Sequence, residues 1–140
     1  MIIIDTNVIS EAIKPGRNSR VVSWLDAQAI ETLFFTAINL SELCLGIEIS
    51  PAGKRREALA SALNELLTEY FSSRILPFDE KAALVYGAMV ARARIGGSTI
   101  SVSDGQIGAI ASSHSFSVAT HDTAPFIALG VPIINPWEIK

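Results

Sequence analysis

Short apolar runs alternate with longer helical patterns along this 140-residue chain, and no other feature restricts its fold as strongly. Runs with the composition of buried strands occupy residues 2–5, 33–36, 75–78, 117–120 and 131–134. Helical patterns occupy residues 8–13, 21–29, 38–49, 57–71, 80–95 and 104–113. Because strands separated by helices pair in parallel, we expect an α/β fold with a parallel sheet and helices on both faces.

Polar and small residues mark where several of these helices begin and end. Thr6 and Asn7 offer a start for the first helix, Asp79 can cap the helix at 80–95, and Ser103 can cap the helix at 104–113. Gly96 and Gly97 can end the helix that precedes them. No repeat or linker interrupts the chain, so we expect one domain over residues 1–140.

Composition excludes several classes of protein. Hydrophobic residues make up 49% of the chain and charged residues 18%, which is typical of a globular core. The only cysteine is Cys44, so neither a disulfide framework nor a thiolate zinc site is expected. No apolar run approaches the roughly 20 residues that span a bilayer, and the start lacks a signal-peptide pattern. We therefore expect a cytoplasmic protein that does not associate with membranes.

Four acidic residues occupy positions where folding can bring them together. Asp5 follows the first predicted strand, Asp122 follows the strand at 117–120, and Glu42 lies about one turn into the helix after the strand at 33–36. Asp104 begins the helix that leads to the strand at 117–120, so its place is less constrained. Ligands of parallel sheets bind beyond the carboxyl ends of the strands. Carboxylates gathered there require a cation, and oxygen ligands select Mg²⁺ or Mn²⁺.

Each acid also has a purely structural interpretation. Asp5 can cap the first helix, Asp104 can stabilise the dipole of a first helical turn, and Asp122 can be an ordinary turn residue. Glu42 is harder to explain in this way, because its helix is apolar and no basic residue lies near it in sequence. A metal site at this edge favours phosphoryl chemistry, with cleavage of a nucleic acid as the leading interpretation.

Further polar residues are candidates for substrate contact. The hydroxyls of Thr6 and Thr120 can hold a water or a phosphate oxygen, and His121 lies beside Asp122. Three cations at a helix N-terminus oppose the helix dipole, which favours a role in binding phosphates or an acidic partner; they are Lys54, Arg55 and Arg56. The net charge of −3 argues against a broad electrostatic surface for nucleic acid.

Four short segments of the chain form an ordered set of motifs: IIDTNVISE at 3–11, SEL at 41–43 with Gly46, SDGQI at 103–107 and ATHDT at 119–123. This set resembles the PIN domain, and within it the VapC-type toxins of the FitB-like branch. LPFD at 76–79 and NPW at 135–137 strengthen the likeness to that branch. The resemblance extends over nearly the whole chain.

This resemblance implies a Rossmann-like fold and a ribonuclease that depends on Mg²⁺ or Mn²⁺. The family's catalytic and metal-binding acids match Asp5, Glu42, Asp104 and Asp122, and its hydroxyl before the last acid matches Thr120. At position 121 many members carry Arg or Asn, so His121 departs from the family pattern at a candidate substrate contact; Asn7 is a further candidate contact.

The resemblance also implies a toxin of a type II toxin–antitoxin pair that forms a homodimer. Its cognate VapB- or FitA-like antitoxin would cover the cleft and bind promoter DNA for the complex.

The expected chemistry has rivals that make different demands. We expect metal-activated water to leave a 5′-phosphate and a 3′-hydroxyl, with Asp5 and Asp104 as the principal ligands. A receiver-type signalling module also uses an acidic Mg²⁺ pocket, but none of the four lysines is well placed for it. A catalytically idle PIN fold would bind without cleaving, and a metal-free nuclease would depend on histidine and leave 2′,3′-cyclic ends.

Overall fold

The structure is a computed structural model, and it describes residues 1–139, so Lys140, the last residue of the predicted domain, lies outside the described residues. Five strands form one sheet in the order β3-β2-β1-β4-β5, and every neighbouring pair is parallel. Their bounds are β1 Ile2–Ile4, β2 Leu33–Thr36, β3 Ile75–Leu76, β4 Ser117–Ala119 and β5 Ile133–Ile134. The predicted α/β fold with a parallel sheet is confirmed.

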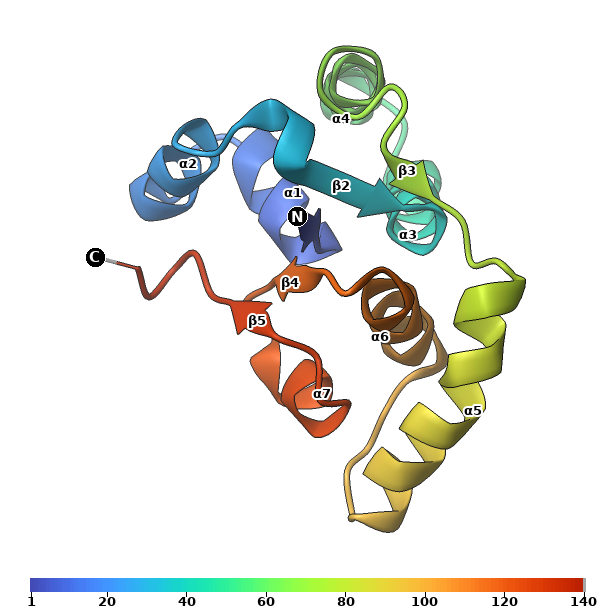
Figure 1. Cartoon of the computed structure of the whole chain (residues 1–140). Helices are drawn as coiled ribbons and strands as arrows, with labels where there is room; N and C mark the ends of the chain where they lie inside the picture. The colour runs from blue at the N-terminus through green and yellow to red at the C-terminus, as the bar shows by residue number, and fades with distance from the viewer. Residues whose placement is uncertain (140) are drawn as a thin grey trace.

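Helices cover both faces of this sheet (Figure 1). The α-helices are α1 Thr6–Ile13, α2 Ser19–Asp26, α3 Ala37–Ile49, α4 Lys54–Glu65, α5 Glu80–Ile95, α6 Val102–His114 and α7 Thr123–Ala128. A 3-10 turn, η1 Ile30–Thr32, precedes β2, and a π-helical turn, η2 Leu66–Tyr70, extends α4.

Two apolar cores result from the alternation of side chains along the strands. Ile3 belongs to the core shared with α5, α6 and α7, whereas its neighbour Ile4 belongs to the core shared with α1 to α4. Successive residues of a strand point to opposite faces, so a strand buried on both sides is apolar throughout. This is why Ile2–Ile4 is an uninterrupted apolar run.

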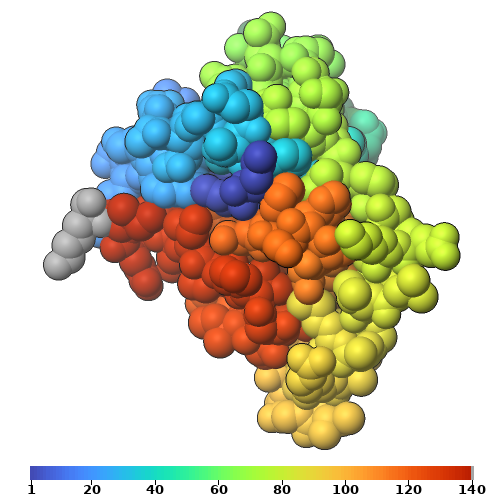
Figure 2. All heavy atoms as spheres, viewed as in Figure 1, coloured from blue at the N-terminus to red at the C-terminus, as the bar shows by residue number. Residues whose placement is uncertain are grey.

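The first strand lies at the centre of the sheet beside a strand from the C-terminal part of the sequence. β1 pairs with β4 through Ile2 and Ser117, Ile3 and Val118, and Ile4 and Ala119. Figure 2 shows the first residues, dark blue, at the surface between the light-blue and the orange segments. The central strand therefore joins residues that lie far apart in sequence, which brings Asp5 next to the segment after β4.

Several boundaries differ from the predictions for local physical reasons. Ser101, not Ser103, caps α6, because its side chain accepts a hydrogen bond from the backbone N–H of Asp104. Pro77 ends β3 at Leu76, one of the two outcomes that this proline allowed for the predicted strand at 75–78, because it has no N–H to donate to a neighbouring strand. α7 was not predicted; it is a short helix with Pro125 in its first turn, where proline's missing N–H costs little. The cap predicted at Asp79 is confirmed.

Candidate active site

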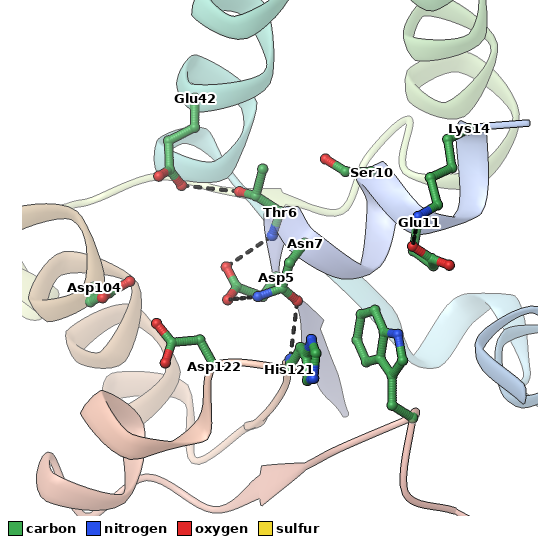
Figure 3. A pocket seen from close by; sticks show the side chains of 11 residues that line it. Asp5, Thr6, Asn7, Ser10, Glu11, Lys14, Glu42, Asp104, His121 and Asp122 are labelled. Carbon is green, nitrogen blue, oxygen red and sulfur yellow. Dashed lines mark hydrogen bonds and ion pairs between the residues drawn. The ribbon is translucent and has the colours of Figure 1, made fainter. Parts of the chain in front are cut away.

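One cavity of about 760 Å³ opens at the carboxyl ends of the central strands. Its lining residues come from α1, α3, α6, the segment after β4 and the C-terminal segment (Figure 3); they are Asp5, Thr6, Asn7, Ser10, Glu11, Lys14, Glu42, Asp104, His121, Asp122 and Trp137. All four acids singled out in the sequence therefore lie at the same cavity. Thr6, Asn7 and His121 lie there as well.

Asp5 lies at the bottom of this arrangement and is only 6% exposed. It caps α1 through the N–H of Thr6, which donates to Oδ1 at 2.8 Å. The capping role considered from the sequence is thus real, and it coexists with a place in the cavity. Oδ2 accepts a 2.8 Å hydrogen bond from the hydroxyl of Thr120 and a longer one of 3.4 Å from the amide of Asn7. The carboxylate is therefore held in one orientation from two sides.

Asn39 is a buried member of this network that sequence reasoning missed. Its amide donates to Oδ1 of Asp5 and to the hydroxyl of Thr6, both at 3.0 Å. Its own carbonyl oxygen accepts a 2.6 Å bond from the hydroxyl of Thr36, the residue that ends β2. An asparagine about one helical turn before Glu42 was the signal that could have revealed it.

Glu42 and Thr6 connect α3 to α1 at the rim of the cavity. The hydroxyl of Thr6 donates to Oε1 of Glu42 at 3.0 Å. Glu42 lies on a face of α3 that the sequence predicts to be partly buried; the residue as a whole is exposed at the edge of the opening, and its carboxylate is partly buried. Its side chain nevertheless points toward Asp5 and the other acids (Figure 3).

Asp104 and Asp122 face the opening from the other side. Asp104 lies in the first turn of α6 and is partly buried, and Asp122 lies immediately before α7 and is exposed. The backbone N–H of Asp122 donates to the hydroxyl of Thr120 at 3.1 Å. One threonine hydroxyl thus fixes both Asp5 and the backbone that carries Asp122.

Burial and mutual repulsion disfavour negative charge in this cavity. Burial raises the pKa of Asp5, and the charge of Asp104 adds to the rise although hydrogen bonds from Thr120, Thr6 and Asn39 oppose it. Partial burial of its carboxylate likewise raises the pKa of Glu42, with contributions from the charges of Asp5 and Asp104. Burial also raises the pKa of Asp104, and the charge of Asp122 adds to it. The acids therefore lack a compensating cation among the described side chains around them.

The described lining of the cavity includes one lysine, and that lysine already has a partner. Nζ of Lys14 lies 2.7 Å from Oε2 of Glu11 on the same helix. The lining thus carries five carboxylates and a single paired ammonium group.

Hard oxygen donors in excess of cations are the set that binds Mg²⁺ or Mn²⁺. Among residues 1–139, however, no three acidic, histidine or cysteine side chains already converge at metal-binding distance. The donor chemistry fits a divalent cation, and binding requires some of these acids to move closer together.

Some sequence-predicted residues lie elsewhere or act differently. The hydroxyl of Thr120 is fully buried, donates to Asp5 and accepts from Asn7, so it does not face substrate as the sequence suggested. Lys54, Arg55 and Arg56 border a separate hollow at the start of α4, and Arg56 pairs with Glu48 at 2.6 Å. Ser10, Glu11, Lys14 and Trp137 border the acidic cavity and were not predicted.

Comparison with known proteins identifies the family of this chain. Residues 2–131 match the sequence pattern of the PIN domain family. The chain belongs to the PIN domain family. This PIN domain is 46% identical to VapC ribonuclease Y4jK of Sinorhizobium fredii and 43% identical to Toxin FitB of Neisseria gonorrhoeae. Both matches extend over 138 residues and cover 99% of each chain.

Solved structures show the same fold. The crystal structure of FitAcB from Neisseria gonorrhoeae contains a chain with a TM-score of 0.93 and 42% identity, covering 99% of this PIN domain and 100% of that chain. A chain in the structure of FitAB bound to IR36 DNA fragment also has a TM-score of 0.93, with 41% identity; 100% of this chain and 98% of that chain are covered. The family assignment makes the receiver-type interpretation wrong. Among residues 1–139, no helix is long and apolar enough to cross a membrane.

Proposed function

We propose that this PIN domain is an endoribonuclease that depends on Mg²⁺ or Mn²⁺ and acts as the toxin of a type II toxin–antitoxin pair. The observation that carries the proposal is the meeting of Asp5, Glu42, Asp104 and Asp122 at one cavity. Similarity over the full chain to a VapC ribonuclease and to Toxin FitB supports it.

Asp5 and Asp104 would be the principal metal ligands, and Glu42 and Asp122 would complete the site directly or through water. A bound divalent cation supplies a water of lowered pKa and neutralises charge that develops on the phosphoryl oxygens. Asp5 already accepts four hydrogen bonds, which use the lone pairs of a carboxylate. The weakest of these, the 3.4 Å bond from Asn7, is the one that cation binding would displace.

The remaining residues of the network orient the carboxylates. Thr120, Asn39 and Thr6 hold Asp5 and Glu42 from behind, so these side chains keep their direction while the cavity fills. Attack by water would leave a 5′-phosphate and a 3′-hydroxyl. The 2′-hydroxyl would not act as the nucleophile, so preference for RNA must come from shape and contacts.

The partner would be an antitoxin of the FitA or VapB class, and promoter DNA would bind through that antitoxin. Structures with the chain's fold include FitAB bound to a DNA fragment. A homodimer and a cytoplasmic location are further expectations of this function.

The decisive experiment compares two Asp→Asn substitutions in RNA cleavage. Asp104→Asn should nearly abolish cleavage of total RNA in Mg²⁺ or Mn²⁺, because it removes a ligand from the cavity. Asp26→Asn, on the exposed end of α2, makes the same chemical change away from the cavity and should leave cleavage intact. Cleavage by Asp104→Asn at the wild-type rate would contradict the proposal. Cleavage that persists in excess chelator and leaves 2′,3′-cyclic ends would instead favour a histidine-dependent mechanism.

Metal binding has a readout that does not require activity. A cation that binds only the folded chain stabilises it, by about 2.7 kcal/mol at a concentration 100 times its Kd. We expect Mn²⁺ to raise the Tm of wild-type protein and to have much less effect on Asp104→Asn. Equal rises in both proteins would mean that the acids of the cavity do not bind the cation.

A further inference from the structure

An aromatic pair forms one wall of the acidic cavity. The rings of His121 and Trp137 are stacked, with centroids 4.4 Å apart and planes inclined by 18°. Both residues line the cavity that contains the four acids. His121 directly precedes Asp122, so the stack lies within one residue of a proposed metal ligand.

Both members of the stack are held by the backbone around them. The N–H of His121 donates to Oδ1 of Asn7 at 3.1 Å, and the amide of the same asparagine donates to Thr120 behind Asp5. The N–H of Trp137 donates to Oδ1 of Asn135 at 3.1 Å, and its carbonyl accepts from the guanidinium of Arg20 at 3.3 Å. These hydrogen bonds hold the backbone segments that carry the two rings, and the bond at His121 connects it through Asn7 to the residues around Asp5.

The two rings differ in exposure. Trp137 is partly buried and packs against the core that contains α1 to α4. His121 is exposed and has Trp137 against one face, so its free surface is the opposite face and the ring edge. The pair thus places an exposed imidazole face at the wall of the cavity, with an indole packed against the opposite face of the ring.

The charge of the cavity gives this surface a purpose. Five carboxylates and one lysine paired with Glu11 line it, so the described side chains there repel phosphate and offer no free cation to attract it. Even a bound divalent cation would leave a negative balance. Affinity for RNA must then come in large part from contacts that do not depend on charge, and stacking on an aromatic ring contributes about 1–3 kcal/mol per base.

We propose that an unpaired base next to the scissile phosphate stacks on the free face of His121, with Trp137 as its support. This inference rests on the proposed ribonuclease function and specifies its substrate: single-stranded RNA or a loop. A base inside a duplex has no free face to offer and must leave its stack to reach the ring.

Binding without cleavage tests the contact directly. Asp104→Asn protein in chelator is mixed with a single-stranded oligoribonucleotide that carries 2-aminopurine, whose fluorescence falls on stacking. When His121→Ala is combined with Asp104→Asn, the affinity for this oligonucleotide should fall about 5- to 150-fold, which is the stacking contribution above converted to a ratio of dissociation constants. His121→Phe retains a flat ring without nitrogens and should keep most of the affinity and the quenching. An absence of quenching at saturating protein, or equal losses for Ala and Phe, would overturn the proposal.

Abasic substrates identify which base is involved. Removing the base that stacks should weaken binding to protein that retains His121. The same removal should have little further effect on binding to protein that carries His121→Ala. Losses that simply add at every position would mean that His121 touches no base. In cleavage assays of the otherwise wild-type enzyme, His121→Ala should mainly raise KM, and Phe should restore it. A collapse of kcat that Phe does not rescue would show proton transfer by His121 and overturn the stacking role.

These outcomes are separable from the function on which the inference rests. If wild-type protein cleaves no RNA in Mg²⁺ or Mn²⁺, the ribonuclease proposal fails whatever His121 does. If cleavage occurs but the binding assay shows no dependence on the ring at 121, only the stacking inference fails.

Discussion

The hydroxyl of Thr120 donates a 2.8 Å hydrogen bond to Oδ2 of Asp5, although 115 positions separate the two residues. The same oxygen accepts hydrogen bonds from the amide of Asn7 and the N–H of Asp122, both at 3.1 Å. This one buried hydroxyl connects the first strand, the first helix and the segment after β4. It therefore determines how two of the four acids are presented to the cavity.

Thr120→Val should lower both stability and activity while keeping the side-chain volume. The substitution removes the acceptor of the Asp122 N–H and of the Asn7 amide, and one of the two donors to Oδ2 of Asp5, at a cost of about 1–3 kcal/mol. It also removes a hydrogen bond that lowers the pKa of Asp5, so that pKa should rise further. Denaturant unfolding and the pH dependence of RNA cleavage measure the two effects. Thr120→Ser, which keeps the hydroxyl, should recover most of the activity; failure to do so would assign the effect to packing.

Asn39→Ala should be strongly destabilising for an uncharged substitution on a helix. Asn39 is fully buried and connects Thr36, Asp5 and Thr6, so its loss leaves buried polar groups unpaired at about 1–3 kcal/mol. Asn64→Ala, on the exposed side of α4, makes the same change outside any such network and should be nearly neutral. Similar free energies of unfolding for the two variants would show that the Asn39 network contributes little.

Asp104→Asn should make the metal-free protein more stable at neutral pH. Because burial raises the pKa of Asp104, the folded chain binds a proton there at pH values where the unfolded chain has lost it. The contribution of this carboxyl to stability is therefore highest at pH values below its ordinary pKa of 3.8, and it falls as pH rises through the raised pKa of the folded state. The gain from Asp104→Asn should be full at neutral pH and vanish as pH falls toward 3.8.

Urea unfolding of the two proteins across this pH range, in chelator, measures the difference. Asp26→Asn serves as the control for the chemical change. A difference that grows as pH falls would have the wrong sign and would contradict the assigned direction of the shift.

Two Gly→Ala substitutions should have opposite effects on stability. A Cβ at Gly105 would lie 2.8 Å from Cε2 of Tyr86 and 2.8 Å from Cγ2 of Val90, where α6 packs on α5. Overpacking there should cost about 1–3 kcal/mol and displace the neighbouring Asp104. A Cβ at Gly87, on α5, would have no atom within 4 Å. Alanine at that helical position should stabilise by about 0.5–1 kcal/mol. Thermal unfolding distinguishes the two, and a stabilised Gly105→Ala would refute the close packing.

Local sequence patterns determined the elements and the edge of the sheet where the acids lie. Apolar runs buried on both faces and helices between them allow only a parallel sheet, so residues directly after strands, such as Asp5, must lie at one edge. Asp79 could be recognised as a cap because capping involves residues only three positions apart. Ser101 was missed because Ser103 offers a similar local signal, and α7 because six residues leave too little periodicity.

The contacts that shape the site were decided only by the tertiary structure. Asn39 meets Asp5, Thr120 meets Asp5, and His121 stacks on Trp137 because strand order brings distant segments together. A single sequence shows which residues can donate, accept or stack, since those are properties of the side chains. It does not show which donor reaches which acceptor, because that depends on packing between elements remote in sequence. For the same reason the sequence placed Thr120 toward substrate, whereas the fold buries its hydroxyl behind Asp5.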